Sequence, residues 1–226
     1  MEHIITLTGG SLPITVEMHE PKGTPKGLVL LAYGSDGLTD DLSGPWKSMI
    51  RGYAASLADQ GFTAAIPDYL ATTRTPPGPA VFDAIAQNRS AWVTALGDAV
   101  DQLMTRSGVG PRHVGLLGFS LGGHVALHLR AKAALLVEFF APTFDGIGPP
   151  GALTHAQIHH GEADRTPGTG FENAAAVQSL LKQEGTATEL FGYPGAGHGF
   201  IGADRFNQDA RDLSKARTLA FFQARL

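Results

Sequence analysis

The stretch that decides the fold reads Val114-Gly-Leu-Leu-Gly118-Phe-Ser120-Leu-Gly122-Gly-His-Val-Ala126. It contains an apolar run, the pattern Gly-x-Ser-x-Gly-Gly and the start of a helical segment. A serine on such a sharp turn takes a strained backbone conformation, which projects its hydroxyl from the carboxyl edge of a sheet. Gly118 and Gly122 are expected where strand and helix pass too closely for a Cβ atom. The stretch predicts that Ser120 is a nucleophile; the alternative is a glycine-rich turn with a helix-capping serine.

Backbone N–H groups near this turn are candidates for an oxyanion hole. Leu121 opens the predicted helix 121–132, and unpaired N–H groups at a helix N-terminus favour negative charge. A second glycine-rich turn, Gly34-Ser-Asp-Gly-Leu38, follows the apolar run 28–33. The N–H of Ser35 is therefore our candidate for the second donor, with an ordinary loop rich in turn formers as an equal alternative.

Strand and helix patterns alternate along the rest of the chain. We expect strands at 4–8, 12–18, 28–33, 62–66, 114–118, 134–139, 156–159 and 187–191, and helices at 46–60, from 79 or 80 to 104, 121–132, 171–184 and 207–225. The first two strands are predicted to form an antiparallel hairpin. The alternation that follows predicts an α/β fold, in which helices cover both faces of a mostly parallel sheet. No repeat or linker interrupts the pattern, so residues 1–226 are interpreted as a single domain.

Composition excludes several classes of function. The chain has 43% hydrophobic and 17% charged residues, a formal net charge of −4 and no cysteine. Disulfides and thiolate catalysis are therefore excluded, and there is no basic face for nucleic acid. The apolar runs are too short to cross a bilayer, and the N-terminus lacks the pattern of a secretory signal. We expect neither a nucleic-acid nor a membrane partner; a cytoplasmic location is the default, and the oligomeric state stays open.

The base that a serine nucleophile needs is predicted to be a histidine near the C-terminus. Among nine histidines, His198 lies in Tyr193-Pro-Gly-Ala-Gly-His-Gly-Phe200, directly after the last predicted strand. From such a loop its ring can reach over the sheet edge to the serine. We predict that His198 is the general base, and the alternative is a surface histidine.

The carboxylate that orients this base is expected between the serine and the histidine in the chain. The segment Ile158-His-His-Gly-Glu-Ala-Asp-Arg165 follows the penultimate predicted strand. Asp164 is our first choice, with a turn-capping aspartate as its alternative. Glu162 ranks second because the turn would present it differently, and Asp145, after the preceding strand, ranks third.

Taken together, these segments resemble the dienelactone hydrolase family of α/β-hydrolases. The resemblance rests on four blocks in the family's order: Pro67-Asp-Tyr-Leu70, Gly118-Phe-Ser-Leu-Gly-Gly123, His160-Gly-Glu-Ala-Asp164 and Tyr193-Pro-Gly-Ala-Gly-His-Gly-Phe200. They span most of the chain, from about Leu28 to the end. The resemblance implies an α/β-hydrolase fold of about eight strands without a large lid. It also implies hydrolysis of small esters or lactones, with no metal and no organic cofactor.

Two positions depart from the family's pattern. The enzymes that give the family its name carry a cysteine where this chain has Ser120, and a glutamate typical of their oxyanion turn is missing near Gly34. Relatives with a serine nucleophile are generally described as carboxylesterases. The resemblance therefore favours a serine esterase or lactonase that acts through an acyl-enzyme, and it leaves the dienelactone substrate open.

Four further features have less specific interpretations. Arg74 and Arg205 are candidate contacts for an anionic substrate group, with solvated arginines as the alternative. His124 and His128 share one face of a predicted helix, but the position after the first lacks the glutamate of a metalloprotease helix. We expect packed histidines there and no metal. In an apolar run, Glu138 should have a hydrogen-bonding partner.

A second group of histidines lies at His155, His159 and His160, where we also expect no metal. His160 is expected to support the turn before Asp164. Two other functions stay open beside the esterase: an acyltransferase or peptidase with the same three residues, and a catalytically silent domain of this fold that binds a small ligand or a partner.

Overall fold

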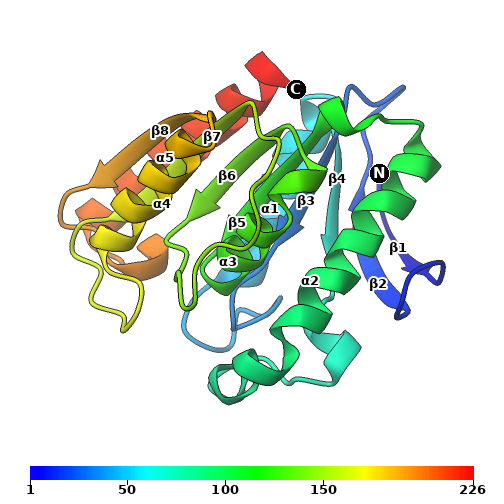
Figure 1. Ribbon diagram of the computed structural model, residues 1–226. Coiled ribbons are helices and arrows are strands. Elements are labelled where there is room, and N and C mark those ends of the chain that lie inside the picture. The colour runs from blue at the N-terminus through cyan, green and yellow to red at the C-terminus, as the bar shows by residue number, and fades with distance from the viewer.

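One eight-stranded sheet forms the centre of the computed structural model, which describes residues 1–226 (Figure 1). The strands are β1 (Glu2–Leu7), β2 (Ile14–His19), β3 (Leu28–Ala32), β4 (Thr63–Pro67), β5 (Val114–Phe119), β6 (Leu135–Phe139), β7 (His155–Gly161) and β8 (Ala187–Tyr193). Their order is β1-β2-β4-β3-β5-β6-β7-β8. The first hairpin and the β2–β4 pair are antiparallel, and the other neighbours are parallel. The predicted hairpin and the mostly parallel sheet are confirmed.

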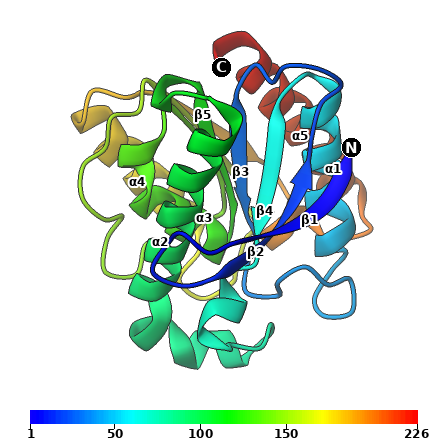
Figure 2. The same cartoon turned by 90° about the vertical axis from the view of Figure 1, so that its right-hand side faces the viewer.

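Five α-helices cover the sheet on both faces. They are α1 (Trp46–Asp59), α2 (Ala80–Ser107), α3 (Leu121–His128), α4 (Phe171–Gln183) and α5 (Arg205–Arg225). Figures 1 and 2 show α2, α3 and α4 on one face and α1 and α5 on the other. None of these helices combines the length and the apolar character that crossing a bilayer requires.

The core lies along the middle of the sheet. Strands β3, β4, β5 and β6 are buried at every residue. Strands that carry helices on both faces read as continuous apolar runs, and this is why the sequence shows no alternation there. A single cluster of 58 buried apolar residues joins the two helical layers through the sheet. This packed core therefore fixes the positions of the carboxyl ends of the parallel strands.

The helix after β5 is shorter than predicted. The sequence pattern favours a helix to residue 132, but α3 ends at His128 and a 3₁₀ turn follows at Arg130–Lys132. The buried side chain of Arg130 donates to the carbonyl of Leu127 at 2.8 Å and to the carboxylate of Glu184 at 2.6 Å. The helix ends where this arginine turns inward, and its partner Glu184 is too distant in the chain for helical periodicity to indicate it.

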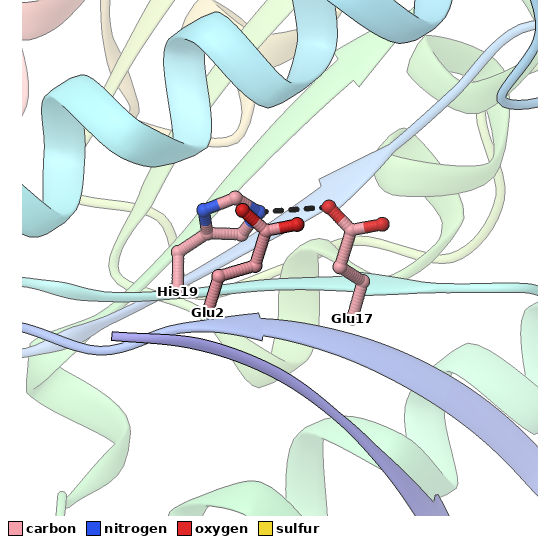
Figure 3. Close-up of side chains that lie close together, drawn as sticks. All are labelled: Glu2, Glu17 and His19. Carbon is pink, nitrogen blue, oxygen red and sulfur yellow. Dashed lines mark hydrogen bonds and ion pairs between the residues drawn. The ribbon is translucent and has the colours of Figure 1, made fainter.

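A polar cluster ties α1 to the edge of the sheet. Ligand-type atoms of Glu2, Glu17 and His19 lie within 4.8 Å of one another (Figure 3). Glu17 accepts hydrogen bonds from Arg51 of α1 at 2.7 Å and pairs with His19 at 2.9 Å. Burial raises the pKa of Glu17, but the hydrogen bonds from Arg51 and His19 outweigh it and leave the pKa below its ordinary value. Because the Glu17 carboxylate already has these two partners, we interpret the cluster as a packing contact.

Candidate active site

The turn between β5 and α3 has the strained geometry that the sequence predicts. Ser120 has φ of 52° and ψ of −120°, a conformation that is unfavourable for a residue with a Cβ atom. A Cβ atom on Gly118 would lie 2.5 Å from the carbonyl oxygen of Gly122, and one on Gly122 would lie 2.1 Å from that of Ala32. The predicted close approach is confirmed, although the obstacle at Gly122 is the end of the neighbouring strand β3. Backbone packing thus holds the serine in place.

Three side chains from three strand ends meet at this turn. The Oγ atom of Ser120 lies 3.1 Å from Nε2 of His198, which follows β8. Nδ1 of His198 lies 2.7 Å from Oδ2 of Asp164, which follows β7. Both distances are within hydrogen-bonding range. The structure therefore brings the three residues predicted from the sequence into one hydrogen-bonded series.

The two other carboxylates predicted as alternatives lie elsewhere. Glu162 is exposed to solvent. Asp145 pairs with Arg89 at 3.1 Å, and its side chain is 81% exposed. Of the three, Asp164 is the one in contact with His198.

Asp164 is buried, and several donors surround its carboxylate. Oδ1 accepts the backbone N–H of Thr166 at 2.9 Å, whereas Oδ2 faces the Thr169 hydroxyl at 3.2 Å and Nε2 of His160 at 3.3 Å in addition to His198. Burial raises the pKa of Asp164, but the hydrogen bonds from His160 and His198 outweigh burial and hold the pKa well below its ordinary value. The carboxylate is therefore ionised at neutral pH and able to orient the imidazole.

The two predicted oxyanion donors lie beside Ser120. Ser35 and Leu121 line the same cavity as Ser120 and His198. Leu121 is the first residue of α3, so its N–H has no helical acceptor. A Cβ atom on Gly34 would lie 3.3 Å from that of Ser120, so a side chain at position 34 would press directly on the serine. The absence of a glutamate there leaves this side of the serine open.

A cavity of about 390 Å³ opens above these residues. Its apolar lining comprises Trp46, Pro79, Phe82, Ile85, Leu121, Pro142, Phe144, Pro167 and Ile201. Apart from His198, the only ionisable side chain in the lining is that of Asp36, which accepts hydrogen bonds from the backbone N–H of Ser43 at 3.0 Å and from its hydroxyl. Phe82 and Phe144 are 59% and 45% exposed, so the cavity has an apolar mouth.

Neither arginine predicted as a substrate contact lines this cavity. Arg74 is exposed at the end of a 3₁₀ turn. The side chain of Arg205 is 89% exposed and pairs with Asp209 one helical turn further on, at 3.3 Å. The structure therefore does not bring Arg74 or Arg205 to the serine, and helical i,i+4 pairing accounts for the position of Arg205.

Two residues at the site were not predicted to contact His198. The ring of Phe140 lies 4.7 Å from that of His198, centroid to centroid, and Phe140 has a positive φ of 42°. The Thr169 hydroxyl lies 3.3 Å from Nδ1 of His198. Phe140 could have been found because it directly follows a predicted strand, at the carboxyl edge. For Thr169 the sequence carries no signal.

Two further histidines, His124 and His159, are packed in the interior. His124 is buried, its Nδ1 lies 3.0 Å from the carbonyl oxygen of Pro142, and its ring lies 4.7 Å from that of His128. Burial, together with the nearby His128, lowers the pKa of His124 to about 4. His159 is buried between Phe139 and Phe191. These rings are neutral packing groups at neutral pH.

The sheet topology, the strained serine turn and the hydrogen-bonded series define an α/β-hydrolase. The sequence profile of the dienelactone hydrolase family matches residues 37–226. The chain therefore belongs to the dienelactone hydrolase family, and it is a hydrolase.

Solved structures agree on the fold. A dienelactone hydrolase-like promiscuous phosphotriesterase from metagenomic libraries is 20% identical, with a TM-score of 0.78 and coverage of 100% of this chain and 98% of the other. A carboxylesterase of Lactobacillus plantarum is 13% identical, with a TM-score of 0.72 and coverage of 99% and 97%. A serine hydrolase without a lid from Xanthomonas campestris is 14% identical, with a TM-score of 0.69 and coverage of 99% and 94%. The comparison with curated proteins finds no match.

Proposed function

We propose that this protein hydrolyses small uncharged carboxylic esters or lactones through an acyl-enzyme on Ser120. The observation that carries the proposal is the series Ser120–His198–Asp164, with successive distances of 3.1 Å and 2.7 Å, opening onto an apolar cavity. A hydroxyl bonded to an imidazole that is itself oriented by a carboxylate is the arrangement that activates a serine nucleophile. The intact series also argues against a catalytically silent binding domain.

Each group has a defined part in the proposed reaction. Ser120 Oγ forms a bond to the acyl carbon while its proton passes to Nε2 of His198. The N–H groups of Leu121 and Ser35 donate to the oxyanion of the tetrahedral intermediate. The intermediate expels the alcohol, which takes the proton from His198. Water then attacks the acyl-enzyme with His198 again as base; the second intermediate collapses, Ser120 Oγ takes the proton back from His198, and the acid leaves. Throughout, Asp164 holds the proton of Nδ1 in place and stabilises the imidazolium.

The charge of the cavity favours uncharged substrates. No lysine or arginine lines it, and Asp36 contributes a negative charge near the serine. A carboxylate that enters an apolar cavity without a cationic partner loses its hydration and gains little in return. We therefore expect the site to discriminate against esters that carry a carboxylate.

Two p-nitrophenyl esters of equal chain length test this selectivity. We expect kcat/KM for p-nitrophenyl butyrate to exceed that for p-nitrophenyl hemisuccinate by about 10- to 100-fold, the usual effect of an unpaired charge in a desolvated site. Asp36→Asn keeps the acceptor for Ser43 and should reduce the gap by improving hydrolysis of the hemisuccinate alone. Equal hydrolysis of the two esters by the wild-type protein would contradict the proposed substrate class.

A further inference from the structure

A fully buried glutamate lies behind the hydrogen-bonded series. Glu138 is in β6, and its Oε2 accepts the backbone N–H of Ala141 at 3.0 Å. Its Oε1 atom is buried and has no partner. This bond to Ala141 closes the turn that holds Phe140 at its positive φ against the ring of His198. The expected partner of Glu138 is thus found for one of its two oxygens only.

A buried histidine on the next strand also has a polar atom without a hydrogen-bond partner. His160 is fully buried, and its Nε2–H donates to the carbonyl of Thr169 at 2.6 Å and lies 3.3 Å from Oδ2 of Asp164. Its other ring nitrogen, Nδ1, is buried and unpartnered. The ring therefore contacts the Asp164 carboxylate and presents a second polar atom to the interior.

The two unpartnered atoms belong to side chains on the same face of the sheet. Glu138 is paired with Ile158 across β6 and β7, and His160 lies two residues after Ile158. Side chains two residues apart in a strand point to the same face, so Glu138 and His160 are diagonal neighbours. Native proteins rarely leave one buried polar atom unsatisfied, and here two lie on neighbouring side chains.

We propose that one water molecule bridges Oε1 of Glu138 and Nδ1 of His160, that the two side chains share one proton through it, and that this pair positions Asp164 and Phe140 on two sides of His198. The proposal rests on the proposed function. The proton is carried either by the carboxyl group beside a neutral imidazole or by an imidazolium beside a carboxylate. Both arrangements have zero net charge and satisfy both buried atoms.

The surroundings of the pair agree with a single shared proton. Burial raises the pKa of Glu138 to about 7, although the nearby His160 lowers it. The other titratable groups that face His160 are Asp164, from the loop after β7, and His198 behind it; α4 contributes the ring edge of Phe171. The Asp164 carboxylate is thus hydrogen-bonded to His198, while Glu138 and His160 together carry zero net charge. They are positioning residues, since neither contacts Ser120.

Variants of Glu138 and His160 separate positioning from a purely structural role. Glu138→Gln keeps an acceptor for Ala141 and supplies an N–H to the water that bridges to Nδ1 of His160, so kcat should stay within about threefold of wild type. Glu138→Met and His160→Phe remove the shared hydrogen bond, and each should lower kcat by about 10- to 100-fold, with KM changed by less than about threefold. Because the two residues act as a unit, the double variant should lose no more than the worse single variant.

His159→Phe is the matched control. His159 is the adjacent residue on β7, equally buried, but it points to the opposite face, where it bonds to the hydroxyl of Tyr193 at 2.8 Å. The His159→Phe variant should lose thermal stability and keep the kcat of the wild-type protein. Three results would overturn the proposal. The first is an equal loss of kcat in His159→Phe, and the second is wild-type kcat in Glu138→Met and His160→Phe. The third is a double variant in which the losses of the two single variants multiply.

A measurement on the wild-type protein tests the proposal even if the variants do not fold. Nitrogen NMR of histidine-labelled protein should show Nδ1 of His160 hydrogen-bonded between pH 5 and pH 6, below the pKa of Glu138 at about 7. A signal typical of a free imidazole lone pair would overturn the proposal. This measurement needs no turnover, so it remains decisive if the protein proves to hydrolyse no ester, a result that would refute the proposed function instead.

Discussion

Replacing Asp164 by asparagine tests how the base is oriented. Thr166 donates its N–H to Oδ1 of Asp164, so the amide oxygen of the asparagine must occupy that position. Its NH₂ group then takes the place of Oδ2, facing His198 Nδ1. An NH₂ donor forces Nδ1 to act as an acceptor, which moves the ring proton to Nε2. That proton points at Ser120, and the imidazole can no longer accept the serine proton.

The size of the effect follows from this change of tautomer. Loss of the correct tautomer and of the carboxylate that stabilises the imidazolium should lower kcat by about 10³- to 10⁴-fold, or about 4–5.5 kcal/mol in the barrier. The assay is steady-state hydrolysis of p-nitrophenyl butyrate near pH 7.5, with thermal unfolding as the test of folding.

Asp145→Asn is the matched control. Asp145 follows the neighbouring strand and carries an exposed ion pair with Arg89, and its variant should keep kcat/KM within about twofold of wild type. A folded Asp164→Asn protein with nearly wild-type activity would show that Asp164 does not orient His198. If Asp145→Asn lost activity and Asp164→Asn kept it, Asp145 would be the carboxylate that orients His198.

Two further predictions concern stability. Gly122→Ala places a Cβ atom 2.1 Å from the carbonyl oxygen of Ala32, so we expect a loss of about 2–4 kcal/mol in the free energy of unfolding, whereas Gly110→Ala, with nothing within 4 Å, should be neutral in the same urea titration. Burial raises the pKa of Glu138 from 4.5 to about 7, so the stability that this group contributes is fully present below pH 4.5 and is lost as pH rises toward 7. Glu138→Gln should therefore match wild type at pH 4 and be more stable by up to about 3 kcal/mol at pH 8; an equal difference at both values would contradict the assignment.

Local patterns predicted most of the fold. The serine turn was predictable because strand, glycines and helix are contiguous, and the steric reasons for Gly118 and Gly122 depend on backbone alone. Helix α1 begins at Trp46, as predicted, and ends at Asp59, one residue before the predicted end, because Gly61 with its positive φ stops the helix. The end of α3 was predicted wrongly, because the buried contact of Arg130 with Glu184 is non-local.

The residues of the candidate site could be predicted where their place follows from the order of the strands along the chain. His198 and Asp164 directly follow predicted strands, and parallel strands deliver such residues to the same edge of the sheet. The cavity wall was not predictable, because its residues come from loops whose paths depend on packing. Arg74 and Arg205 illustrate this limit: each is near the site in sequence, and neither side chain lines the cavity.

Covalent labelling with a fluorophosphonate probe, followed by peptide mass spectrometry, tests directly whether Ser120 is the nucleophile. We predict a single adduct on the peptide that contains Ser120 in the wild-type protein. Ser120→Ala should fold normally, take up no probe and hydrolyse p-nitrophenyl butyrate several orders of magnitude more slowly. An adduct at another residue, or hydrolysis by Ser120→Ala at a rate close to wild type, would contradict the account.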